Sequence, residues 1–165
     1  MTTPELGLTA KALVAPGKGI LAADESAPTI EKRFRALGIE STEEKRRVYR
    51  QMLFTTAGIE EFISGVILFD ETIRQKADDG TAFPEALSRR DIIPGIKVDK
   101  GAKPLAGALG EKVTEGLDGL RERLAEYKGL GARFAKWRGV ITIGGGMPSA
   151  YCIDANAHAL ARYAA

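Results

Sequence analysis

Residues 65–69, Gly65-Val66-Ile67-Leu68-Phe69, form a short apolar run of the kind that becomes a buried strand. Similar runs indicate four strands in all, near residues 19–23, 64–69, 93–98 and 134–143. Segments rich in helix-forming residues lie between them or follow them, at 29–37, 43–55, 83–90, 115–127 and 150–165. Because long helical connections separate the strands and hairpin-length connections are missing, the pattern predicts parallel pairing. The predicted fold class is α/β with four parallel βα units.

The composition is that of one globular domain over residues 1–165. The chain has 44% hydrophobic residues and a formal net charge of +2, which is too small to indicate binding to nucleic acid or to an anionic membrane. No apolar stretch approaches the roughly 18 residues that cross a bilayer. With one cysteine, Cys152, and no secretory leader pattern, we expect a protein of the reducing cytoplasm.

Asp24 is the first candidate functional residue. It directly follows the strand at 19–23, and strand alternation puts it on the same face as Ile20 and Ala22. In parallel α/β folds, functional groups gather at the carboxyl ends of strands. The alternative is that Asp24 caps the following helix, which is a common position for aspartate.

Cations mark the third and fourth predicted strands. Lys97 shares a face with Asp99 in a strand that is otherwise apolar, which indicates either a functional face or an edge strand with one wet face. Lys136 and Arg138 point to one side of their segment, and Trp137 points to the other side, where it is expected to pack under helices. Two cations on an inner face require water, carboxylates or an anion such as a phosphorylated substrate; the alternative is a solvated outer face.

The segment after Asp24 offers hydroxyl groups and cations at a predicted helix start. Ser26 precedes that helix, and Lys32 with Arg33 forms a basic pair within it. The arrangement suits an anion, although a capping serine and solvated cations are the more common interpretation. His158 is the only histidine and the sequence has no metal-binding motif, so we expect no metal and no cofactor.

Six motifs resemble class I fructose-bisphosphate aldolases in order and spacing. They are GKGILAADES (17–26), SGVILFDETIRQ (64–75), PGIKVDKG (94–101), PLAG (104–107), FAKWRGV (134–140) and NAHALARYA (156–164). The resemblance covers essentially the whole chain and about half of the family's length. It implies that the four βα units are the N-terminal half of a (β/α)8 TIM barrel.

The resemblance also implies roles for individual residues. Asp24 resembles the active-site aspartate that contacts sugar hydroxyls, and Lys136 resembles the lysine beside the Schiff-base lysine. The residues that resemble phosphate-binding groups are Lys97, Arg138 and Ser26, with the basic pair Lys32 and Arg33 at the border of the active site and Glu25 close to the pocket. The family's catalytic glutamate and Schiff-base lysine belong to the part of its sequence that follows.

Two functions are therefore expected from the sequence. The first is metal-independent, reversible cleavage of fructose 1,6-bisphosphate to dihydroxyacetone phosphate and glyceraldehyde 3-phosphate, a reaction that needs a neutral lysine amine. The second is a non-catalytic half-barrel that keeps sugar-phosphate binding and assembles with itself. Four βα units leave two strand edges and one sheet face open, so we expect a homo-oligomer in which these edges pair.

Overall fold

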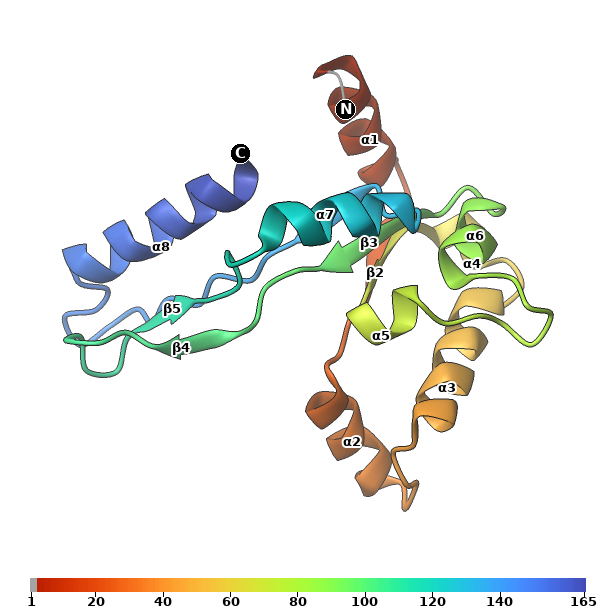
Figure 1. Cartoon of the computed structure of the whole chain (residues 1–165), viewed down its shortest axis with the longest axis horizontal. Helices are drawn as coiled ribbons and strands as arrows, with labels where there is room; N and C mark the ends of the chain where they lie inside the picture. The colour runs from red at the N-terminus through yellow and green to blue at the C-terminus, as the bar shows by residue number, and fades with distance from the viewer. Residues whose placement is uncertain (1–2) are drawn as a thin grey trace. The chain divides into compact units, whose positions relative to one another are not determined.

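The computed structural model describes residues 3–165, which divide into two compact units. Unit 1 consists of residues 3–97 and 126–135, and unit 2 of residues 98–125 and 136–165. Figure 1 shows the helices and strands of both units. Among the described residues, none of the helices combines the length and apolar character needed to cross a membrane.

The main sheet contains four parallel strands in the order β1-β2-β3-β6. Their bounds are β1 Gly19–Ala23, β2 Ile63–Leu68, β3 Ile93–Lys97 and β6 Phe134–Lys136. The predicted α/β class and parallel pairing are confirmed. The prediction that the last strand reaches residue 143 is wrong, because β6 ends at Lys136. After β6, the Arg138 N–H donates to Asp99 Oδ2, and the Arg138 carbonyl accepts a hydrogen bond from the Thr114 hydroxyl. The backbone groups of Arg138 are therefore bonded to side chains and do not extend the sheet.

The helices confirm most of the predicted helical segments. The longer ones are α1 Thr3–Leu13, α2 Ala27–Ala36, α3 Glu43–Thr55, α7 Leu120–Gly129 and α8 Ala150–Ala164. The short ones are α4 Ile59–Phe62, α5 Asp70–Ile73 and α6 Phe83–Ser88. The sequence pattern does not predict α1, α4 or α5. α7 begins later than predicted, because Gly116 and Gly119 have φ of 130° and 61° and break the helical backbone.

A small antiparallel sheet interrupts the third βα unit. It pairs β4 Ala102–Pro104 with β5 Lys112–Thr114. The expectation that hairpin-length connections are missing is therefore wrong here. The turn between these strands contains Gly107 and Gly110 at φ of 78° and 81°, a backbone that glycine adopts without steric cost.

One face of the main sheet in unit 1 holds buried apolar side chains. Ala23, Leu68 and Ile96 lie side by side in register across β1, β2 and β3, and each is almost completely buried. Two further buried rings, Phe54 of α3 and Phe83 of α6, make an edge-to-face contact with ring centroids 5.3 Å apart.

The opposite face carries glycines where a ring lies against the backbone. A Cβ atom at Gly95 would overlap the Phe134 ring, and one at Gly65 would lie 2.6 Å from Leu13 Cδ2 and 3.3 Å from Phe134 Cε1. Both glycines therefore provide room for side chains packed on the sheet.

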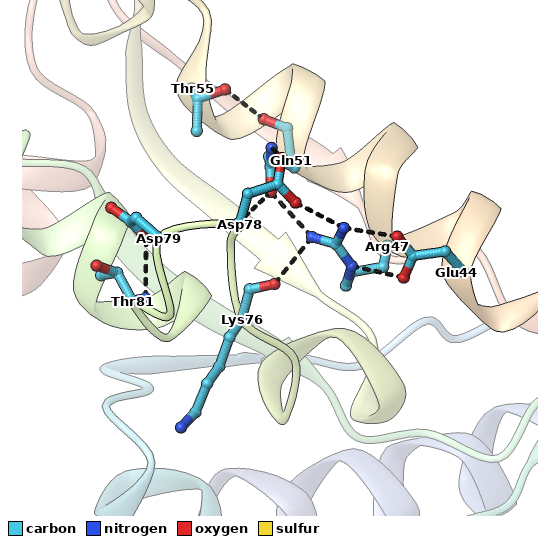
Figure 2. A network of polar contacts seen from close by, with 8 residues as sticks. All are labelled: Glu44, Arg47, Gln51, Thr55, Lys76, Asp78, Asp79 and Thr81. Atoms are coloured by element: carbon cyan, nitrogen blue, oxygen red, sulfur yellow. Dashed lines mark hydrogen bonds and ion pairs between the residues drawn. The ribbon is translucent and has the colours of Figure 1, made fainter.

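Polar contacts fix α3 to the segment that follows α5. Figure 2 shows the Arg47 guanidinium between Glu44 of its own helix and Asp78, with N–O distances of 2.7 Å to each carboxylate. The Gln51 amide donates to Asp78 at 2.6 Å and accepts from the Asp78 N–H. The pKa of Asp78 is lowered chiefly by the hydrogen bond from Gln51 and next by the hydrogen bond from Arg47.

In unit 2, α8 is fixed to the β4–β5 hairpin by its first turn. Glu111 accepts from the Ser149 N–H at 2.6 Å and from its hydroxyl at 2.5 Å, while the same hydroxyl accepts from the Cys152 N–H. The buried Asn156 amide donates to the Lys112 carbonyl at 2.9 Å. The Ser149 contacts lower the pKa of Glu111.

Gly95→Ala should destabilise unit 1 by about 1–3 kcal/mol, because the new methyl group displaces the Phe134 ring. Gly19→Ala is the matched control, since a Cβ at this strand glycine meets nothing within 4 Å. Urea unfolding measures both changes. In a Phe134→Ala background the Gly95→Ala cost should disappear, and an unchanged cost would contradict the overlap.

The Glu111–Ser149 contact should make stability depend on pH. Because the folded-state pKa of Glu111 is depressed, its contribution is fully present above the unfolded value of about 4.3 and is lost as pH falls through the folded value. Glu111→Gln should therefore lower the melting temperature at pH 7 and make little difference at pH 3. Glu122→Gln, at an exposed position of α7, controls for the lost charge. If Glu111→Gln lowers the melting temperature by the same amount at pH 7 and at pH 3, the proposed link between the Glu111 pKa and stability is contradicted.

Candidate functional site

The β1–α2 connection carries the first group of candidate residues. Asp24 directly follows β1 and its side chain is largely buried. The alternative that Asp24 caps the next helix is wrong, because Ser26 occupies the N-cap position of α2. The Ser26 hydroxyl makes no capping bond to the helix backbone and lies 3.2 Å from the Thr29 hydroxyl.

Glu25, between these two residues, forms ion pairs with two arginines. One carboxylate oxygen accepts from Arg33 of α2, and the other accepts from Arg50 of α3 at 2.5 Å. The Arg50 side chain is only 2% exposed, whereas that of Arg33 is 60% exposed. Lys32, the other member of the predicted basic pair, is exposed on α2.

Lys97 is the last residue of β3 and is half-buried. The edge-strand alternative for it is wrong, because β3 lies between β2 and β6 in the sheet. The neighbouring Val98 N–H donates to the Lys136 carbonyl at 3.1 Å, continuing the ladder between these strands. A charged residue in an interior strand requires a local reason other than the protection of an edge.

Lys136 ends β6 and is half-buried, and Arg138 is exposed in the irregular segment that follows. Trp137, between them, packs on Tyr163 of α8 with ring centroids 5.3 Å apart. Burial, together with the Asp99 carboxylate, raises the pKa of Tyr163. The expected contact of Trp137 with a helix is therefore present, and that helix is α8.

The candidates are distributed over both units. Asp24, Glu25, Ser26 and Arg33 lie in or beside the β1–α2 connection of unit 1, and Lys97 ends β3 in the same unit. Lys136 and Arg138 belong to unit 2. The sequence does not single out Arg50, because an arginine among the charged residues of a helix is usually solvated. The available signal was weak: Phe54 lies four residues later on the same helical face and is also buried.

No group of three or more His, Cys, Asp or Glu side chains in the described part of the chain is arranged to hold a metal ion. The chemistry that these residues offer is that of carboxylates, hydroxyls and cations. Such groups hydrogen-bond to polyols and pair with phosphates.

The parallel sheet of four βα units, with Asp24, Lys97 and Lys136 at or after the carboxyl ends of its strands, is that of a partial βα-barrel, as the sequence predicts. The chain matches the family described as Fructose-bisphosphate aldolase class-I over residues 5–165. It is 66% identical, over its full length, to a probable fructose-bisphosphate aldolase class 1 of Xanthomonas campestris, and covers 49% of that protein. It is 58% identical over 161 residues to a fructose-bisphosphate aldolase of Drosophila melanogaster, covering 97% of this chain and 45% of that protein.

A solved structure gives the same result. It is the ternary co-crystal structure of fructose-bisphosphate aldolase from Plasmodium falciparum with TRAP and a small-molecule inhibitor, with a TM-score of 0.94 and 52% identity. The match covers 98% of this chain and 47% of that one. The chain belongs to the class I fructose-bisphosphate aldolase family, as the sequence motifs predict, and spans about half the length of the relatives it matches.

Proposed function

We propose that this chain binds a sugar bisphosphate and takes part in metal-independent fructose 1,6-bisphosphate cleavage in the cytoplasm. The observation that carries the proposal is the position of Asp24, Lys97 and Lys136 at or just after the carboxyl ends of parallel strands. Carboxyl ends of strands are where sites of parallel α/β folds form. The family membership supports the choice of substrate.

In this proposal each residue has a role set by its chemistry. Asp24 accepts hydrogen bonds from sugar hydroxyls and assists proton transfer, and Lys136 orients the substrate and stabilises negative charge. The groups that hold phosphate are Lys97, Arg138, Ser26, Lys32 and Arg33. Carbon–carbon cleavage further requires a Schiff-base lysine, which the motifs of this chain do not include.

Self-assembly is a second candidate function, and one feature of unit 1 favours it. β1 is an edge strand of the four-stranded sheet, and its Ile20 side chain is 43% exposed. An uncovered edge strand with an apolar side chain is a template for pairing with another chain. We propose that β1 of one copy pairs with β6 of a second copy, which would remove both edges.

Fructose 1,6-bisphosphate, added with a chelator present, should raise the melting temperature of the chain. At one hundred times its dissociation constant, a ligand stabilises the folded state by about 2.7 kcal/mol. Lys97→Met and Lys136→Met should each reduce the shift by more than half. Lys128→Met, which changes an exposed residue of α7, should leave it intact. Equal shifts in all four proteins would place the phosphate site elsewhere.

Sedimentation at micromolar concentration should show a species of twice the chain mass if the edge strands pair. Ile20→Lys places a charge on the exposed face of β1 and should shift the equilibrium to monomer by like-charge repulsion between copies. Leu109→Lys controls for a new surface charge, since Leu109 is fully exposed in the β4–β5 hairpin. A monomeric wild-type chain would contradict the assembly.

A further inference from the structure

Arg50 makes two different contacts with one residue of the β1–α2 connection. Its Nη1 donates to Glu25 Oε2 at 2.5 Å, and its Nη2 donates to the Glu25 backbone carbonyl at 3.2 Å. The first contact fixes the side chain of Glu25. The second fixes the peptide plane that joins Glu25 to Ser26. A lysine has a single ammonium group and cannot reproduce this pair of bonds in one geometry.

The position of Glu25 determines the positions of its neighbours. Asp24 precedes it and Ser26 follows it, so a change in the backbone angles of Glu25 would change the position of one of these side chains relative to the other. Arg33 holds the second carboxylate oxygen from the solvent side. Glu25 is therefore held by a buried arginine on one side and by an exposed one on the other.

Arg50 is itself held in place by its surroundings. Its guanidinium lies 5.4 Å from the centroid of the Tyr49 ring, and Tyr49 packs edge-on against Phe34 of α2. The preceding turn of α3 is fixed by Arg46, which binds Glu71 through two N–O contacts of 2.8 and 2.6 Å. The helix that carries Arg50 is thus anchored independently of Glu25.

Stability alone does not explain this buried pair. Apolar side chains of similar volume often stabilise a core as well as a buried ion pair does, because both charges lose their hydration. What an Arg–Glu pair adds is a defined direction for each hydrogen bond. A need for defined geometry is greatest where functional side chains must be held to within a fraction of an ångström.

We propose that Arg50 is a positioning residue that clamps the β1–α2 connection through Glu25, so that Asp24 and Ser26 are held ready for the sugar phosphate. The proposal rests on the proposed function for the identity of the ligand. The clamp itself is a property of unit 1 and can be measured without ligand.

Arg50→Lys tests the clamp while keeping the charge. We expect amide hydrogen exchange at residues 24–27 to become about tenfold faster, and the dissociation constant for fructose 1,6-bisphosphate to rise about tenfold. Arg46→Lys is the matched control, because it makes the same change one turn earlier on α3, where the carboxylate partner is Glu71. This control should change neither quantity.

The double variant Glu25→Gln with Arg50→Met separates positioning from stability. Removing both charges should return the urea midpoint close to that of the wild type, while exchange at residues 24–27 stays fast and binding stays weak. The proposal is overturned if Arg50→Lys leaves this exchange unchanged, or if the double variant binds as tightly as the wild type. A wild-type chain that binds no fructose 1,6-bisphosphate refutes the proposed function, and the exchange measurement then decides the clamp by itself.

Discussion

The arrangement of side chains on one face of the main sheet depends on the packing of the Phe134 ring against Gly95 and Gly65. Neither glycine has a Cβ atom, so the ring lies directly on the backbone of β2 and β3. Side chains alternate along a strand, so Lys97 shares the face of Gly95 and Lys136 shares the face of Phe134. The face on which the ring lies is therefore also the face that carries the two lysines that we propose to act on the sugar phosphate.

The sequence predicted the parts of the fold that depend on local pattern. The four strands, their parallel pairing and the family follow from apolar runs, connection lengths and motifs. The early end of β6 could not be predicted in this way. The segment Val140-Ile141-Thr142-Ile143 has a composition typical of a strand, and it lies outside the sheet for a non-local reason. The contacts of Arg138 with Asp99 and Thr114 are made by residues 39 and 24 positions away.

The candidate site shows the same division between local and distant information. Asp24, Lys97 and Lys136 could be predicted because they end or follow apolar runs. Arg50 could not, because a helix with several arginines is usually solvated on its polar side. Arg47 keeps 18% of its side chain exposed and contacts Asp78 and Glu44, whereas Arg50, three residues later, is 2% exposed and contacts Glu25. Only the tertiary partner distinguishes the two.

The single cysteine has a practical consequence for following motion in unit 2. Cys152 is 1% exposed in the first turn of α8, and its Sγ lies 3.7 Å from the Lys112 carbonyl of β5. A thiol reagent can reach it only when this turn of α8 separates from β5. At high reagent concentration the labelling rate would equal the rate of that opening, and at low concentration it would report the opening equilibrium. Cys152 is therefore a native probe for the opening of α8, and no engineered label is needed.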